Sequence, residues 1–98
     1  MKLIIALVRP FVIDRLIVAL EDIEGFPGIT ISDAEGFGLR LRTPGDAISP
    51  LRPSKRIEIV APDEMVEALV ASVKQHAHTG RKGDGFVIVL NIEDSTLI

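Results

Sequence analysis

The ten residues HAHTGRKGDG, at positions 76 to 85, concentrate residue types that could do chemistry. Glycine lets backbone N–H groups approach a bound anion closely, and Arg81 and Lys82 add positive charge beside them. The segment is not a nucleotide-hydrolase phosphate loop, because that loop runs from a strand into a helix and this one follows a predicted helix. Its spacing alone favours an ordinary connection between a helix and a strand, with an anion site as the alternative.

The two histidines of this segment raise the question of metal binding. His76 and His78 are two residues apart, so on a helix their side chains point about 200° away from each other. They therefore do not form the i, i+4 pair of a helical metal site. Beyond the end of a helix they could chelate a metal together with an acid such as Glu35 or Asp46. We predict no metal site and keep these two histidines as the metal-binding alternative.

The chain carries no strong catalytic signature. It has no cysteine, and Ser72 falls in the middle of a predicted helix, so no activated nucleophile is evident. An enzyme of the acylphosphatase type needs an anion-binding arginine loop and a positioned amide side chain. Arg9 follows the first predicted strand, but the only asparagine, Asn91, lies in the last one. We predict that the protein is not an enzyme.

The composition indicates one small domain, residues 1–98. Hydrophobic residues make up 47% of the chain, more than a domain of this size can bury, so we expect a subunit interface. The net charge of −3 and an aromatic content of four phenylalanines argue against nucleic-acid binding. The apolar run KLIIALV is too short for a signal-peptide core or a membrane span. We therefore expect a cytoplasmic protein that does not insert into a membrane.

Positive charge is concentrated between residues 39 and 56. The segment has a net charge of +4 and leaves −7 on the rest of the chain, since its charged residues are Arg40, Arg42, Asp46, Arg52, Lys55 and Arg56. A basic segment on an acidic body favours an anionic ligand or partner at that place. A solvated loop with scattered arginines would give the same pattern.

The spacing of apolar residues predicts four strands and two helices. Continuous or alternating apolar runs indicate strands at residues 3–8, 28–36, 56–61 and 86–92. Apolar residues at helical spacing indicate one helix that begins with Asp14 as its N-cap and stops by Gly25. A second helix is opened by residues 62–64 and ended by Gly80. Residues 37–55, with three prolines and two glycines, predict a long loop.

This order of elements predicts an α+β fold of the ferredoxin-like βαββαβ type, with a four-stranded antiparallel sheet. The two helices would cover one face of the sheet. The first and last strands are apolar on both sides, so the other face also needs a cover. Further copies of the same chain are the simplest cover.

Four motifs, in this order, give the chain a resemblance to a known family. They are RPF after the first strand, EGFG at 35–38, IEIVAPDE at 57–64, and TGRKGDG at 79–85. Together they resemble the nitrogen regulatory PII signalling family, over roughly residues 1–38 and 54–94. The resemblance implies a homotrimer of ferredoxin-like subunits. It also implies that residues 37–55 are the T-loop, which docks on partner proteins, and that residues 79–85 are the B-loop.

The resemblance further implies a nucleotide site in the cleft between subunits. Gly83 and Gly85 would bring their amides closest to the phosphates, with Asp84 fixing the turn. The implied nucleotide-binding residues are Thr30, Gly36, Phe37, Gly38, Arg40, Arg56, Glu58, Ile59, Val60, Gly80, Arg81, Gly83, Asp84 and Gly85. The implied partner-binding residues of the T-loop are Arg42, Asp46, Ser49 and Arg52. No cofactor is required; the possible ligands are ADP, AMP and ATP.

Several departures from the family pattern narrow the expected function. Leu39 and Arg40 stand where the family has a glutamine, so the resemblance gives no support for sensing 2-oxoglutarate. The chain has no tyrosine to be uridylylated. Phe86 replaces a basic residue, and the family's C-terminal arginine pair is absent from EDSTLI. We therefore expect a divergent member with a shortened T-loop that prefers ADP or AMP to ATP and regulates a partner, with membrane transporters as a candidate class.

Two other functions remain open from the sequence. One is a metal-binding trimer that resembles the divalent-cation tolerance proteins, with His76 and His78 as ligands. The other is a constitutive adaptor that binds no nucleotide. The glycines of the B-loop favour the nucleotide-responsive regulator over the metal-binding trimer.

Overall fold

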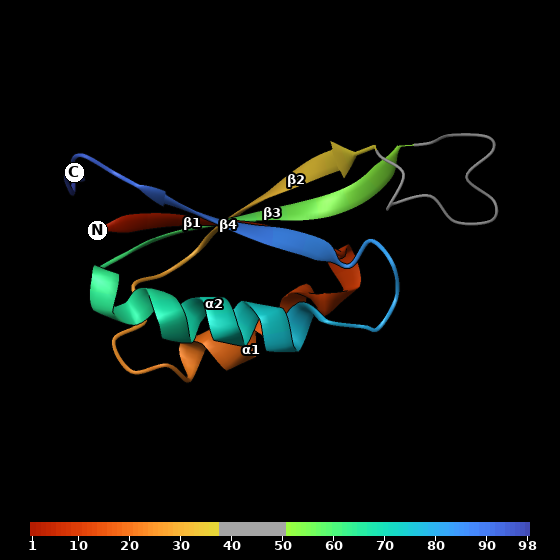
Figure 1. The fold of residues 1–98 in the computed structure, drawn as a ribbon, viewed down its shortest axis with the longest axis horizontal. Helices are drawn as coiled ribbons and strands as arrows, with labels where there is room; N and C mark the ends of the chain where they lie inside the picture. Colours follow the sequence, from red (N-terminus) through yellow and green to blue (C-terminus); the bar gives the residue numbers. More distant parts are fainter. Residues whose placement is uncertain (38–50) are drawn as a thin grey trace.

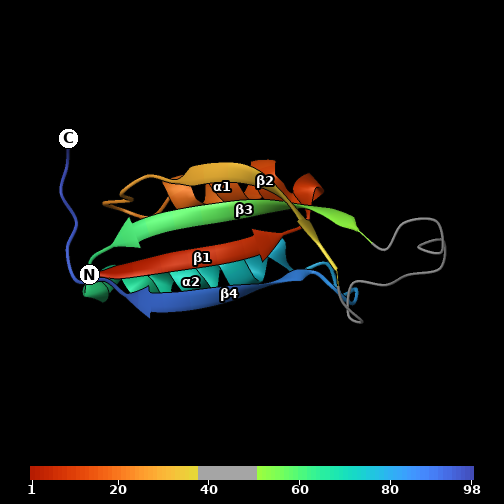
Figure 2. The same cartoon turned by 90° about the horizontal axis from the view of Figure 1, so that it is seen from above.

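The computed structural model describes residues 1–37 and 51–98. The elements are β1 (Lys2–Val8), the 3-10 turn η1 (Pro10–Val12), α1 (Ile13–Glu21), β2 (Thr30–Gly36), β3 (Arg52–Ala61), α2 (Asp63–Ala77) and β4 (Gly85–Asn91). The strands form a four-stranded sheet in the order β2-β3-β1-β4, and every neighbouring pair is antiparallel. Both helices lie against the same face of this sheet (Figures 1 and 2). The predicted ferredoxin-like α+β fold is confirmed.

The sheet face beneath the helices holds the hydrophobic core. Side chains alternate between the two faces of a strand, and one set from the central strands is buried: Ile4, Ala6, Val8, Ile57, Ile59 and Ala61. The helices add the residues that their apolar spacing predicts, which are Leu16 and Leu20 from α1 and Leu69, Val73 and Ala77 from α2. The two helices pack on the sheet through this single core.

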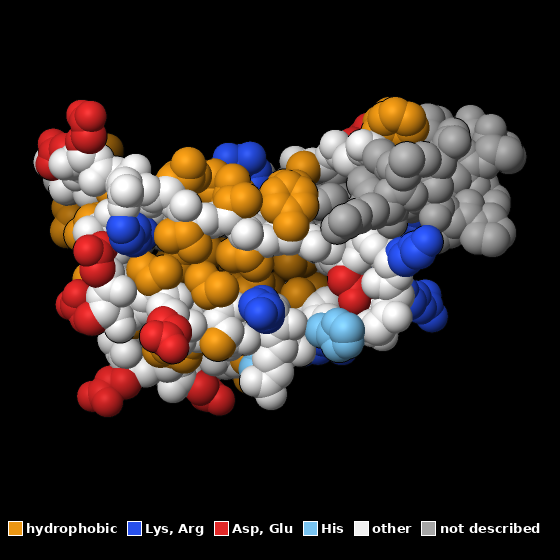
Figure 3. All heavy atoms as spheres, in the orientation of Figure 1, with side chains coloured by type: hydrophobic (Ala, Val, Ile, Leu, Met, Phe, Trp, Pro, Cys, Tyr) orange, Lys and Arg blue, Asp and Glu red, His pale blue; other side chains and the backbone are white. Residues whose placement is uncertain are grey.

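The opposite face of the sheet, here called the open face, is also apolar. Its most exposed hydrophobic side chains are Val60, Phe86, Ile88 and Leu90, with exposed fractions of 42% to 55%. The strand register places them in rows with Leu3, Ile5 and Leu7 of β1. No described element covers these rows, and hydrophobic side chains gather along β4 in Figure 3. The prediction that the first and last strands of the sequence, β1 and β4, are apolar on both sides is therefore confirmed.

Two predicted boundaries were wrong. The loop was predicted to reach residue 55, but β3 begins at Arg52. Residues 52–54 pair with residues 34–36 of β2 beyond the end of β1, where Val8 pairs with Lys55. This forms a two-stranded ribbon that projects past the sheet (Figure 1). Asp14 is not an N-cap, because the turn η1 leads directly into α1 and places Asp14 in its first turn.

The helices end close to the predicted stops. Helix α1 ends at Glu21, four residues before Gly25, and α2 ends at Ala77 with His78 as its C-cap. Gly25 and Gly80 both have positive φ angles, +78° and +85°, which suits the turns that follow the helices. Among the described residues, no helix is both long and apolar enough to cross a membrane.

Candidate functional site

A cleft of about 550 Å³ opens at the end of β1. One wall is the end of the β2–β3 ribbon, with Gly36, Phe37 and Arg52, and the facing wall is the connection from α2 into β4, with Arg81 and Gly83 to Phe86. The floor comes from the end of β1 and from η1. The cleft therefore lies where three separate parts of the chain meet, and it contains the glycine-rich segment with which the sequence argument began.

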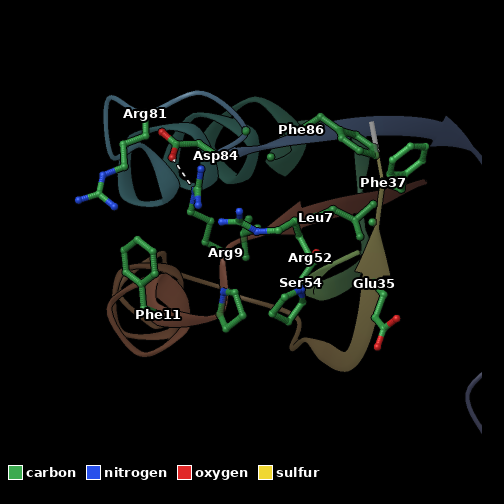
Figure 4. A pocket seen from close by; sticks show the side chains of 16 residues that line it. Leu7, Arg9, Phe11, Glu35, Phe37, Arg52, Ser54, Arg81, Asp84 and Phe86 are labelled. Carbon is green, nitrogen blue, oxygen red and sulfur yellow. Dashed lines mark hydrogen bonds and ion pairs between the residues drawn. The ribbon is translucent and has the colours of Figure 1, made fainter. Parts of the chain in front are cut away.

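Some charged side chains lie toward the centre of the cleft and aromatic side chains lie toward its two ends (Figure 4). The guanidinium groups of Arg9 and Arg52 point toward its centre, and Arg9 reaches Asp84. Phe37 and Phe86 lie at one end and Phe11 at the other. All three rings are more than half exposed. The cleft thus combines apolar surface with a few convergent polar groups, the composition typical of small-molecule sites.

The carboxylate of Asp84 organises the B-loop. It accepts a hydrogen bond from the backbone N–H of Thr79 at 2.7 Å and from that of Gly80 at 3.1 Å. The Thr79 hydroxyl also donates to it, and the Arg9 Nε does so at 3.2 Å. A second Arg9 nitrogen, Nη2, donates to the Lys82 carbonyl. The loop is therefore held in one shape by a single acidic side chain and by an arginine from the other end of the chain.

These hydrogen bonds decide the charge of Asp84. Burial by itself would raise the pKa of this carboxyl group. The hydrogen bonds from Thr79, Gly80 and Arg9 outweigh that cost and hold the pKa below the ordinary value of 3.8. Asp84 is therefore ionised at neutral pH, and it neutralises Arg9 inside the cleft.

Gly85 joins the B-loop to β4 at a point where no side chain fits. Its φ angle is +131°, and a Cβ added there would lie 1.8 Å from the Leu7 carbonyl oxygen of β1. Gly83 has a φ angle of +76°, in the region that glycine adopts without strain. All three B-loop glycines therefore have positive φ angles, and at Gly85 the close approach to β1 excludes a side chain as well.

Arg15 secures the other end of the connection between α2 and β4. Its Nε donates to the His76 carbonyl at 2.7 Å and its Nη2 to the His78 carbonyl at 3.1 Å. These are carbonyls at the C-terminal end of α2, which lack partners within the helix. Arg9 and Arg15 therefore tie both ends of the segment to the β1–α1 region.

Comparison with known proteins decides the family. The family model for nitrogen regulatory protein P-II matches residues 1–98. The nitrogen regulatory protein P-II of Bradyrhizobium diazoefficiens is 38% identical over 103 residues, which cover 100% of this chain and 91% of that protein. The Azospirillum brasilense protein of that name is 36% identical, and P-II 1 of Escherichia coli is 33% identical, with 96% and 94% of this chain covered and 88% and 86% of those proteins.

The chain belongs to the P-II family. As a member of this family it is a regulator in signal transduction, and the family resemblance drawn from the four sequence motifs is confirmed. The P-II family consists of regulatory proteins. The effector and the partner of this member have to be inferred from its own cleft and surface.

The structure brings six of the fourteen implied nucleotide-binding residues to the cleft. These six are Gly36, Phe37, Arg81, Gly83, Asp84 and Gly85. The cleft is also lined by Arg52, which was assigned to partner binding from the sequence. Gly80 lies in the same loop, and its amide is bonded to Asp84. Gly38, Arg40, Arg42, Asp46 and Ser49 lie outside the described residues.

The other implied residues lie along β2 and β3, away from the cleft of their own chain. Thr30 pairs with Glu58 across the two strands, and Val60 is exposed on the same open face. Arg56 Nε donates to Glu58 Oε1 at 3.3 Å. Ile59 points the other way, and its side chain is buried in the core beneath the helices. Its side chain is therefore not on the surface that Thr30, Glu58 and Val60 share.

The two histidines occupy separate environments. His76 Nδ1 lies 2.8 Å from the carbonyl oxygen of Ser72, one turn earlier in α2. His78 is exposed, with its Nδ1 3.7 Å from Asp84. Within residues 1–37 and 51–98, no three His, Cys, Asp or Glu side chains are grouped to hold a metal ion.

The sequence argument missed several residues that the structure places in the cleft. Arg9 and Phe11 stand in the RPF motif that carried the family resemblance, but neither was assigned to the site. Ser54 and Glu35 line the cleft because they belong to the β2–β3 ribbon. The prolines of residues 37–55 led to the prediction of a loop where β3 already begins. The one available signal for Arg9 was its position directly after the buried strand β1. A cation at that position lies at the end of the sheet, where the cleft opens.

Proposed function

We propose that the protein is an effector-responsive regulator that binds an adenine nucleotide in this cleft, with ADP or AMP preferred to ATP. The observation that carries the proposal is the meeting of the B-loop, the base of the T-loop and Arg52 around one cleft. Backbone amides beside glycines with positive φ can approach phosphate oxygens closely. Arg81 and Arg52 supply charge for the same group.

The preference for fewer phosphates follows from the charges around the cleft. Its described lining includes three arginines, Arg9, Arg52 and Arg81, and two acids, Glu35 and Asp84. The excess is a single positive charge. Phe11, Phe37 and Phe86 also line the cleft. Each additional phosphate adds negative charge that these charged residues do not balance. The adenine ring, by contrast, would contact the apolar surface of the phenylalanines.

We further propose that three copies assemble through the open face of the sheet. An apolar face with side chains as exposed as Val60, Ile88 and Leu90 is typical of an interface. In such a trimer the cleft would lie at a subunit boundary. Thr30, Glu58 and Val60 of one copy could then complete the site of its neighbour, which would explain their absence from the cleft of their own chain.

The regulated partner would be a protein that the T-loop contacts, and we propose a membrane transporter as its class. The T-loop joins β2 to β3 directly at the cleft, through Phe37 on one side and Arg52 on the other. A ligand between these residues would favour one arrangement of the loop over others. Occupancy of the cleft could thus be read by a partner as a change in the loop.

Calorimetric titration with ATP, ADP, AMP and cyclic AMP, with and without magnesium, tests the proposal. We expect micromolar binding of ADP or AMP, weaker binding of ATP, and loss of binding in Gly83→Val. Gly28→Val is the matched control, because Gly28 also has a positive φ angle, +111°, but precedes β2 at the end opposite the cleft. No heat with any nucleotide on the assembled protein would overturn the nucleotide proposal.

A further inference from the structure

Arg9 and Asp84 form an ion pair inside the cleft, unlike a typical surface pair. The Arg9 Nε and Asp84 Oδ1 atoms are 3.2 Å apart, and the two side chains are only 14% and 17% exposed. Lys55 and Asp33 also form an ion pair, but Asp33 is 85% exposed. Because solvent screens the Arg9–Asp84 pair less, its charges act more strongly on anything else bound in the cleft.

The pair removes from the cleft a charge that an anion would otherwise meet. The Arg9 guanidinium points toward the centre of the cleft, where Arg52 also points (Figure 4). Asp84 neutralises it from the B-loop side, and the Lys82 carbonyl accepts from its Nη2. Arg9 is thus present at the site but engaged, and its availability to a ligand depends on the charge of one carboxylate.

We propose that Asp84, by neutralising Arg9, limits how many negative charges the cleft accepts, a specificity role that rests on the anion binding proposed above. Removal of the Asp84 charge frees the charge of Arg9 and favours ligands with more phosphates. Removal of the Arg9 charge leaves Asp84 as an unbalanced negative charge and disfavours them. Removal of both restores the original balance.

This role is separable from the structural role of Asp84 in the loop. An asparagine keeps a side-chain oxygen that can accept from the Thr79 and Gly80 amides, so Asp84→Asn removes the charge and retains an acceptor. Arg9→Gln likewise keeps a donor. A purely structural role would weaken the binding of all anions by a similar factor. A charge role changes the ratio of affinities between anions that differ in charge.

The experiment is a titration series of phosphate, pyrophosphate and tripolyphosphate, alongside AMP, ADP and ATP, at low salt. We expect Asp84→Asn to raise the affinity for tripolyphosphate relative to phosphate at least about fivefold. Arg9→Gln should lower the same ratio by a similar factor, and the double variant should return it to within about twofold of the original. Asp33→Asn is the matched control, since it adds the same net charge outside the cleft and should leave the ratio unchanged.

The outcomes separate this inference from the nucleotide proposal. If the polyphosphates bind with the expected changes of ratio but no nucleotide binds, the charge role of Asp84 holds and the nucleotide proposal fails. If nucleotides bind but the ratio is the same in all four proteins, the charge role is wrong. Failure of the unaltered protein to bind any of these anions overturns both.

An independent measurement guards against loss of the loop in the variants. Amide hydrogen exchange of Thr79 and Gly80, followed by NMR, reports whether their hydrogen bonds to residue 84 survive. Protection retained in Asp84→Asn, together with the changed ratio, supports the charge role. A changed ratio that appears only where protection is lost assigns the effect to loop shape and contradicts the proposal.

Discussion

The two faces of the sheet are built from the same kinds of residue but differ in what covers them. Ile4 of β1 faces the helices and is fully buried, whereas Ile88 of β4 faces the other way and is 42% exposed. The two positions lie on neighbouring strands, one residue apart in register, because Ile4 pairs with Val89 and Ile5 with Ile88. The two helices cover only one apolar face of the sheet. A single chain therefore does not explain why the residues of the open face are hydrophobic.

The largest expected effect on the stability of one chain is at the covered face. Ile4→Ala should lower the free energy of unfolding by about 2–5 kcal/mol, because it leaves a cavity in a packed core. Ile88→Ala, the same substitution on the open face, should cost under about 1 kcal/mol in dilute protein. Urea unfolding of both variants at low concentration makes the comparison. Equal losses at the two positions would show that the open face is covered within the chain.

Gly85→Ala should be next in size, at about 3 kcal/mol. The added Cβ would lie 1.8 Å from the Leu7 carbonyl oxygen. Strands β1 and β4 would therefore have to separate at the end of their ladder, where Val8 pairs with Gly85. Gly28→Ala is the control, since Gly28 also has a positive φ angle but no heavy atom lies within 4 Å of an added Cβ. Thermal unfolding of the two variants measures the difference, and similar losses would contradict a specific overlap with β1.

The comparison of faces also shows how far the sequence could lead. Periodicity predicted the helix faces that contain Leu16, Leu20, Leu69 and Val73, because burial on one side leaves a repeat in the sequence. Strict alternation also holds in β3, where Ile57 and Ile59 face the core and Glu58 faces away. Applied residue by residue, that alternation would have removed Ile59 from the predicted site.

The start of β3 and the Arg9–Asp84 pair could not be predicted in the same way. Pro53 indicated a loop, but it lies in a ribbon end where β1 no longer pairs with β3, so the missing N–H is not needed there. Arg9 and Asp84 are 75 residues apart in the chain, and no local pattern relates them. The B-loop composition left an anion site open as the alternative to an ordinary connection, but only the tertiary structure shows which charges are already neutralised.

The B-loop sharpens the comparison, because its contribution to stability depends on pH and that of the two apolar faces does not. The folded-state pKa of Asp84 lies below 3.8, so its stabilising contribution is present above that value and is lost as the pH falls through the folded-state pKa. Asp84→Asn should therefore cost about 1.5 kcal/mol at pH 7. The difference between the two proteins should shrink below pH 3.8.

Urea unfolding of both proteins across this pH range provides the measurement. Asp33→Asn serves as the control, since Asp33 is exposed and its loss should change stability by less than about 0.5 kcal/mol. A difference between the original protein and Asp84→Asn that stays constant down to low pH would show that the carboxylate charge contributes nothing to the loop.

The smallest expected effect on one chain is that of Ile88→Glu, yet it tests the open face most directly. On a free surface the substitution should change the unfolding free energy by about 0.5 kcal/mol or less. In an interface it would place an unpaired charge between apolar surfaces, which costs several kcal/mol. Size-exclusion chromatography with light scattering should therefore find a folded single chain where the original protein is assembled. Val18→Glu, on the exposed side of α1, should leave the assembly intact. If Ile88→Glu assembles as readily as Val18→Glu, the open face is not the interface, and the neighbour that would complete the cleft must approach from another side.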